Sequence, residues 1–213
     1  MIEFLFTFTL KSIYLSQKIF MDFLPLHSHL ELARFYWKIV LQPGDWAIDA
    51  TCGNGKDTLQ LGKFSLGGII GLDKQQIAIE NTSTLLKKYL PEDQCKKIHL
   101  FCTSHMHFPA LAYKYPIRLI IYNLGYLPGS NKKITTITED TLKSLTSALE
   151  LIMPGGLITI CCYPGHVEGA KEQIFLVQKA QELPSAQYII CHHTWLNKHA
   201  SASLLLIQKK NSY

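Results

Sequence analysis

The sequence predicts one α/β domain built on a doubly wound, mostly parallel β-sheet. Strand-like and helix-like segments alternate between residues 46 and 181, which is the pattern of a sheet with crossover helices. With 213 residues, of which 47% are hydrophobic, the chain can bury one substantial core but is short for two. No helix separates the last two strand-like segments, residues 188–195 and 203–208. We therefore expect that pair to be antiparallel.

The expected strands and helices follow one another with short connections. Apolar residues recur at three- and four-residue spacing from Leu26 to Val40, which predicts an amphipathic helix that ends before Pro43. Apolar runs bounded by turn residues predict the strands. The expected strands are residues 46–50, 69–72, 98–102, 118–123, 157–162, 188–195 and 203–208. The helices expected after the first strand are residues 57–61, 75–90, 139–153 and 167–182.

Residues 1–20 form an apolar stretch ahead of the expected domain. The stretch is not typical of a signal peptide, because Glu3 stands where a basic region belongs and no small-x-small cleavage site follows. Its apolar residues have helical spacing, which fits an added amphipathic helix, and a mis-assigned start before Met21 is the alternative. We expect residues 1–20 to be an N-terminal extension and residues 21–213 to form the domain.

Composition narrows the location and the partners of the protein. The formal net charge of +5 suits an anionic partner without requiring one. The six cysteines form no C-x-x-C pair, which favours reduced thiols over disulfides or zinc, and the histidine pairs lack a third metal ligand. Prolines and glycines interrupt the longest uncharged run, residues 151–167. We therefore expect a cytoplasmic protein with no metal and no membrane partner.

The segment from Trp46 to Leu61, WAIDATCGNGKDTLQL, predicts a nucleotide site. It reads as a strand, a glycine turn and a helix, an order that places backbone N–H groups and the positive end of a helix around a bound nucleotide. A dinucleotide and S-adenosylmethionine are the two candidates. The dinucleotide fingerprint G-x-G-x-x-G is incomplete, because Gly53-Asn54-Gly55 is followed by Thr58 where the third glycine belongs.

Polar side chains stand at the carboxyl ends of the expected parallel strands. Ligands of such sheets bind outside those ends, near the point where the strand order reverses. The polar residues placed there are Asp49, Asp73, Ser104, Asn123 and Tyr163. We expect the chemistry of the protein at this edge of the sheet.

The pattern Asp49-x-Thr51-x-Gly53-x-Gly55 resembles the first motif of class I methyltransferases. The resemblance implies a Rossmann-like sheet of seven strands with an antiparallel last strand, and S-adenosylmethionine as the cofactor. In that resemblance the glycine turn approaches the methionine part, Asp73 accepts hydrogen bonds from the ribose, and residues 103–105 cover the adenine. The cofactor-binding residues so expected are Asp49, Thr51, Gly53, Asn54, Gly55, Asp57, Thr58, Asp73, Lys74, Ser104, His105 and Asn123.

Three motifs together resemble a smaller family, the one labelled "putative rRNA methylase". They are DATCGNGKDT at residues 49–58, NLGYLPG at residues 123–129 with Lys132 and residues 134–136 after it, and YPGH at residues 163–166. The resemblance covers residues 26–209, and it implies a tRNA 5-(aminomethyl)-2-thiouridine methyltransferase that acts on the wobble uridine. Two residues depart from the family pattern, Asn131 and Thr103, each where an acidic residue is usual.

Residue types limit the chemistry independently of the family. Methylation of carbon five of a pyrimidine usually needs a cysteine nucleophile, and the loop after residue 123 has none. We interpret Cys161 and Cys162 as packing residues. Amine methylation instead needs a neutral amine held in line with the methyl group. We expect the Asn123 side-chain oxygen to orient that amine and Tyr126 to pack on the uracil or beside the sulfonium, and these two are the catalytic candidates.

The segments after residues 123 and 162 supply the expected RNA contacts. The substrate-binding or RNA-binding candidates are Gly125, Lys132, Lys133, Tyr163 and His166. His105 and His166 could transfer protons or contact RNA, and helix capping or a backbone bond is the alternative for each. The expected partner is the anticodon arm of tRNA, gripped by one domain or by a homodimer. Methylation of rRNA or of another amine, a non-catalytic RNA-binding protein and a dinucleotide oxidoreductase remain alternatives.

Overall fold

The computed structural model describes residues 28–125 and 136–211. The N-terminal extension expected at residues 1–20 lies outside this part of the chain, so the predicted domain boundary stays a prediction. Three candidate site residues, Tyr126, Lys132 and Lys133, also lie outside the described residues.

A seven-stranded sheet with the order β3-β2-β1-β4-β5-β7-β6 forms the centre of the described fold. Its strands are β1 (Trp46–Asp49), β2 (Gly68–Asp73), β3 (Ile98–Cys102), β4 (Ile117–Asn123), β5 (Ile152–Cys162), β6 (Tyr188–His193) and β7 (Ser203–Lys209). The pairs from β3 through β5 are parallel, and β7 runs antiparallel to both β5 and β6. The last strand is thus inserted between its two neighbours, which confirms the predicted fold class.

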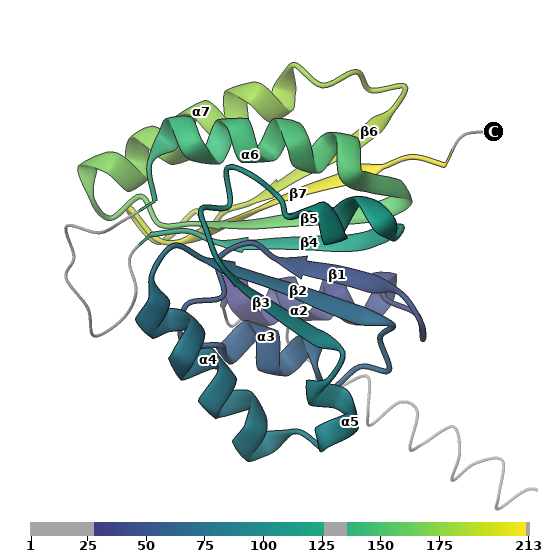
Figure 1. Ribbon diagram of the computed structural model, residues 1–213. Helices are drawn as coiled ribbons and strands as arrows, with labels where there is room; N and C mark the ends of the chain where they lie inside the picture. The colour runs from purple at the N-terminus through teal and green to yellow at the C-terminus, as the bar shows by residue number, and fades with distance from the viewer. Residues whose placement is uncertain (1–27, 126–135, 212–213) are drawn as a thin grey trace, which may run out of the picture.

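Helices cover both faces of the sheet. They are α2 (His29–Val40), α3 (Lys56–Leu61), α4 (Gln76–Tyr89), α5 (Glu92–Cys95), α6 (Thr138–Leu151) and α7 (Val167–Gln181), with a 3₁₀ turn, η2 (Ala110–Lys114). Figure 1 shows α6 and α7 side by side on one face, with α3 and α4 on the other. Apolar side chains of α2 and α3 share one buried cluster with strands β1, β4, β5 and β7, whereas α6 and α7 share a second. No helix among the described residues is long and apolar enough to cross a membrane.

Helix α2 is docked on the sheet by its apolar stripe. Ser28 caps its first turn by accepting a hydrogen bond from the Glu31 backbone N–H at 3.2 Å. Leu32, Ala33 and Trp37 are buried, as their three- and four-residue spacing requires. The Trp37 indole N–H donates to the Thr159 hydroxyl at 3.0 Å, so the one polar atom of this large side chain is also satisfied inside the core.

The structure differs from the predicted elements chiefly around Pro154. We expected the helix to reach residue 153 and the strand to begin at 157, but β5 begins at Ile152, immediately after α6. The pairing between β4 and β5 shifts register between Ile117 and Leu119, and Gly155 has φ +76°. The proline and glycines therefore lie in an irregular start of the strand rather than in a separate turn. The short helix α5 and the 3₁₀ turn η2 were not predicted.

The docking of α2 yields a stability prediction. Trp37→Ala should lower the free energy of unfolding by about 3–5 kcal/mol, because it empties a buried site and leaves the Thr159 hydroxyl without its donor. Ile39→Ala is the matched control on the same helix, since Ile39 is 64% exposed, and it should change stability by less than about 0.5 kcal/mol. Urea unfolding followed by circular dichroism measures both, and equal losses would contradict the assigned packing.

Candidate active site

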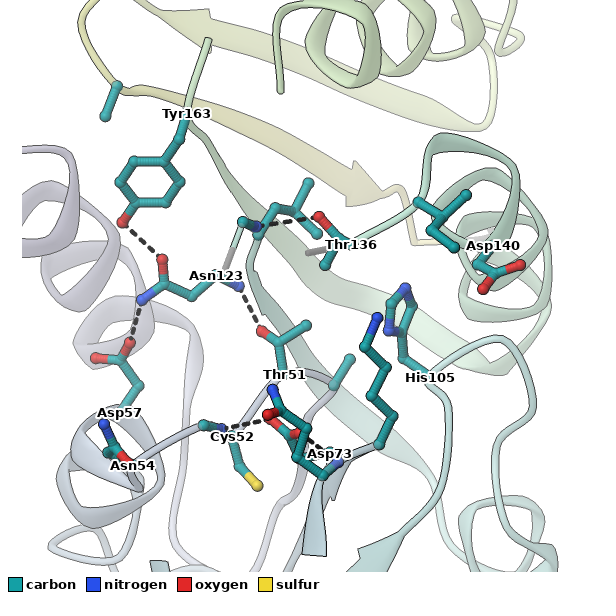
Figure 2. A pocket seen from close by; sticks show the side chains of 18 of the residues that line it. Thr51, Cys52, Asn54, Asp57, Asp73, His105, Asn123, Thr136, Asp140 and Tyr163 are labelled. Atoms are coloured by element: carbon teal, nitrogen blue, oxygen red, sulfur yellow. Dashed lines mark hydrogen bonds between the residues drawn. The ribbon is translucent and has the colours of Figure 1, made fainter. Parts of the chain in front are cut away.

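A cavity of about 830 Å³ opens at the carboxyl ends of β1, β2, β4 and β5. That size suits a nucleotide-sized ligand. The predicted site residues that line it are Thr51, Gly53, Asn54, Asp57, Asp73, Lys74, Ser104, His105, Asn123, Gly125, Tyr163 and His166. The lining residues that sequence reasoning missed are Leu30, Ala50, Cys52, Lys56, Gln75, Leu124, Thr136, Ile137, Asp140, Gly165, Ala200 and Ala202. The expected edge of the sheet therefore holds a real concavity, and Figure 2 shows its walls.

The turn between β1 and α3 requires glycine at two positions. Gly53 has φ +51° and Gly55 has φ +79°, in the left-handed region that residues with a Cβ rarely adopt. A Cβ at Gly55 would also lie 2.9 Å from the Thr82 Cα atom of α4. The Thr82 hydroxyl donates to the Gly53 carbonyl at 2.9 Å, so α4 both crowds the turn and fixes it. The backbone can thus approach a ligand closely on its open side.

Asp49 supports this turn from the protein interior, on the side away from the cavity. It is 1% exposed, and its carboxylate accepts hydrogen bonds from the Thr58 hydroxyl at 2.6 Å and the Thr51 backbone N–H at 3.2 Å. Burial raises the pKa of Asp49 to about 7. Asp49, Gly55 and Thr58, which were expected to bind the cofactor, do not line the cavity. In the structure they shape the turn that does.

Asp73 stands on the open side of the same turn. One carboxylate oxygen accepts a hydrogen bond from the Gly53 backbone N–H at 3.0 Å, and the other accepts one from the Gln75 backbone N–H at 2.9 Å. Figure 2 shows Asp73 beside this turn. Each carboxylate oxygen can accept a further bond, so Asp73 retains acceptor capacity at the cavity wall. Burial raises its pKa. This arrangement fits the expected contact with two ribose hydroxyls.

His105 lies in the opposite wall, close to α6. It is 9% exposed, and burial lowers its pKa to about 4, so the imidazole is neutral at pH 7. Its Nε2 atom is 3.4 Å from the Thr141 hydroxyl, and its backbone carbonyl accepts from Ser144 at 2.7 Å. A base with so low a pKa is poorly matched to proton transfer at neutral pH. His105 therefore serves better as a neutral wall of the pocket.

His166 caps a helix. It is the N-cap residue of α7, and its Nδ1 atom accepts a hydrogen bond from the Gly169 backbone N–H at 3.0 Å. The capping alternative considered for this histidine is therefore confirmed. Because His166 also lines the cavity, the N-terminal end of α7 lies at the site.

Asn123, the last residue of β4, is bonded on three sides (Figure 2). Its backbone N–H donates to the Thr51 hydroxyl at 2.7 Å, which ties the end of β4 to the glycine turn. Its side-chain Nδ2 donates to Asp57 at 3.0 Å, and its Oδ1 accepts from the Tyr163 hydroxyl at 2.6 Å. Burial raises the pKa of Tyr163, so the phenol stays protonated and remains a donor. The carboxamide of Asn123 is consequently held in one orientation.

The chain segments on either side of residues 126–135 are joined at the cavity wall. The Gly125 N–H donates to the Thr136 hydroxyl and the Thr136 N–H donates to the Gly125 carbonyl, both at 3.0 Å. The Thr136 hydroxyl in turn donates to Glu172 of α7 at 2.9 Å, and the Thr141 hydroxyl donates to the other Glu172 oxygen at 2.6 Å. Glu172 is only 2% exposed. This buried acceptor holds Thr136, and through it Gly125, at the cavity wall.

The cysteines near the site are not activated. Cys161 and Cys162 are buried in β5, and burial raises the pKa of both thiols, that of Cys162 to about 12. Cys52 lines the cavity, but it is 5% exposed and burial raises its pKa as well. Thiols with raised pKa values are poor nucleophiles. The described residues therefore offer the site no cysteine ready for covalent catalysis.

These features define a class of protein. The glycine turn after the first strand, the acidic residue after the second and the order of the seven strands are those of a class I methyltransferase. A solved structure from Clostridium thermocellum, described as a "putative rRNA-methylase", superposes with a TM-score of 0.79 and 29% identity over 87% of this chain and 100% of that one. A Streptococcus mutans protein in complex with S-adenosylhomocysteine, described as a "putative methyltransferase", superposes with a TM-score of 0.75 and 29% identity, over 86% of this chain and 99% of that one.

The chain belongs to the family described as "Putative rRNA methylase", which matches residues 69–209. The chloroplastic tRNA (mnm(5)s(2)U34)-methyltransferase of Arabidopsis thaliana is 36% identical over 191 residues, which are 85% of this chain and 69% of that protein. The predicted family, the fold and the cofactor are thereby confirmed. The protein is an S-adenosylmethionine-dependent methyltransferase.

The raised pKa of Asp49 gives a prediction for the pH dependence of stability. From about pH 4 to pH 7 the folded state holds a proton that the unfolded state has lost, so this group makes stability fall as pH rises through that window. Asp49→Asn cannot titrate, and its amide can bond to both Thr51 and Thr58. Its free energy of unfolding relative to the wild type should therefore increase from pH 4.5 to pH 7.

Urea unfolding at several pH values measures this difference. Asp93→Asn, at an exposed position on α5, controls for the loss of one carboxylate. A stability difference between Asp49→Asn and the wild type that stays constant with pH would contradict the assigned burial of the charge.

Proposed function

We propose that this enzyme methylates the exocyclic amine of a 5-aminomethyl-uridine at the wobble position of tRNA. The observation that carries the proposal is the Asn123 carboxamide, fixed by Asp57 and Tyr163 in the wall of the cofactor cavity without an activated cysteine beside it. The name of the Arabidopsis thaliana relative, which specifies residue U34 of tRNA, supports the choice of substrate. Amine methylation fits such a site, because positioning can supply most of the acceleration.

The cavity residues fit the cofactor. When bound, S-adenosylmethionine supplies a methyl group on a positively charged sulfur. The turn at Gly53 and Asn54 would hold its methionine part, Asp73 would accept from its ribose, and Ser104 with neutral His105 would border its adenine. The absence of a Cβ at Gly53 leaves room for a ligand to approach the backbone of the turn closely.

The substrate amine must reach the methyl group as a free base. An alkylamine has a pKa of about 10, so it is mostly protonated at neutral pH. The Asn123 oxygen accepts one bond from Tyr163 and can accept a second, from an N–H of the amine. Held in this way, the nitrogen lone pair can point along the line of transfer. Tyr126, Lys132 and Lys133 lie outside the described residues, so their contacts with uracil and phosphates stay predictions.

The anticodon arm of tRNA is the proposed partner. The net charge of +5 favours a polyanion, and the described residues form one fold without an appended RNA-binding module. One domain, or a homodimer that extends its basic surface, would then grip the arm. Methylation of rRNA or of another amine by the same site is the alternative, and the description of the family favours testing it.

The proposal predicts methyl transfer to tRNA in a purified system. The enzyme and S-adenosylmethionine should convert the aminomethyl nucleoside to its methylated form in tRNA from cells that lack this gene, with one S-adenosylhomocysteine formed per methyl group. Nucleoside mass spectrometry detects the product. Ribosomes and the free nucleoside are the parallel substrates. Product in ribosomal RNA alone would establish the alternative, and unchanged tRNA would refute the proposal.

Asn123→Ala should reduce kcat by about 100-fold while leaving affinity for S-adenosylhomocysteine within about 3-fold, because the lost oxygen acts on the amine rather than on the cofactor. Single-turnover kinetics and calorimetry measure the two quantities. Ser147→Ala, at an exposed hydroxyl on α6, should change neither. Full turnover by Asn123→Ala would remove this residue from the reaction.

A further inference from the structure

Two residues of α2 end a chain of hydrogen bonds that runs through Asn123. The Arg34 guanidinium donates to Asp57 at 2.7 Å, and Asp57 accepts from the Asn123 amide on its other oxygen. On the far side of Asn123, the Tyr163 hydroxyl is 2.8 Å from His29 Nε2. Helix α2 lies outside the alternating strands and helices that carry the cofactor turn, yet it supplies both ends of this chain.

The chemistry of these groups fixes the direction of every bond. Asp57, ion-paired to Arg34, only accepts, so the group of Asn123 that faces it must be the NH₂. The other edge of the amide is then its oxygen, which only accepts, so Tyr163 must donate its single hydroxyl proton to it. His29 Nε2 must therefore carry a proton and donate to the Tyr163 oxygen. No other assignment satisfies all of these short contacts.

We infer that His29 and Arg34 are positioning residues that set the orientation of the Asn123 carboxamide, with its oxygen rather than its NH₂ offered to the substrate amine. This inference rests on the proposed amine methylation. Without Arg34, the Asp57 carboxylate would lose the ion pair that holds it against Asn123, and without His29, the Tyr163 hydroxyl would lose the contact that holds it there. The Asn123 oxygen would then be held less firmly toward the amine, while the cofactor turn would remain intact.

The packing of α2 separates this role from ordinary docking. Trp37 and the apolar stripe hold the helix on β5 and β7, and the Tyr36 hydroxyl lies 3.1 Å from His193 Nε2 on β6. None of these contacts touches Asn123. The His29 ring also packs edge-on against two aromatic rings. Its centroid lies 5.1 Å from that of Tyr163 and 6.4 Å from that of Trp195, and these contacts hold the imidazole beside the phenol. One helix thus carries separable docking and orienting contacts.

A double-mutant cycle on the full-length enzyme with aminomethyl tRNA tests the inference. His29→Leu, which removes the donor but keeps bulk, should lower kcat about 5- to 10-fold, with the KM for S-adenosylmethionine unchanged. His29→Gln, whose amide can donate to Tyr163, should restore most of kcat. In a Tyr163→Phe background, His29→Leu should cost nothing further, because its effect passes through the phenol. Tyr36→Phe is the matched control on α2 and should leave kcat unchanged.

A second readout does not depend on turnover. The side-chain amide signals of Asn123 in a ¹⁵N-resolved NMR spectrum, assigned by comparison with Asn123→Ala, should shift in His29→Leu and Arg34→Met but not in Tyr36→Phe. The positioning role would be overturned if His29→Leu lowered kcat in the Tyr163→Phe background as much as it does in the wild type. Asn123 side-chain signals that do not shift would overturn it as well. A wild-type enzyme that methylates no aminomethyl tRNA would instead refute the proposed function, so the two failures are distinguishable.

Discussion

The contacts between the glycine turn and its two carboxylates are the constraint on which the site depends. Asp49 binds the turn from inside the protein and Asp73 from the cavity side, so residues 51–55 are held against both β1 and β2. The Thr51 hydroxyl then accepts the backbone N–H of Asn123. A single side chain therefore links the glycine turn to the carboxyl end of β4. One connected set of short bonds thus orders both segments along the cavity wall.

Burial shifts the pKa values of the ionisable groups around the glycine turn and the end of β4. It raises the pKa of Asp49 and lowers that of His105, so both favour their neutral forms far more than they would in water. It also keeps the Tyr163 phenol protonated and the nearby thiols unreactive. The site thus offers hydrogen-bond donors and acceptors rather than nucleophiles. That balance suits a transfer in which the substrate supplies the attacking nitrogen.

Several parts of the site could be predicted because they lie within short, local motifs. The order of strand, glycine turn and helix at residues 46–61 dictated its own conformation, since glycine adopts the positive φ of residues 53 and 55 without the steric cost of a Cβ. The parallel alternation placed Asp73 and Asn123 at one edge of the sheet. The residues that the sequence did not indicate lie outside such motifs. His29 and Arg34 come from a helix with only an amphipathic pattern, and nothing in that pattern says which polar residue faces a site.

The sequence by itself determined the fold class, the cofactor turn and the family, because each follows from periodicity or from residues adjacent along the chain. Only the tertiary structure decided that Asp49 supports the turn rather than lining the cavity, and that His166 caps α7. It alone joined Arg34, Asp57, Asn123, Tyr163 and His29, which lie 23 to 134 residues from their bonded partners. Contacts across such separations depend on how the layers pack, and no local pattern encodes them.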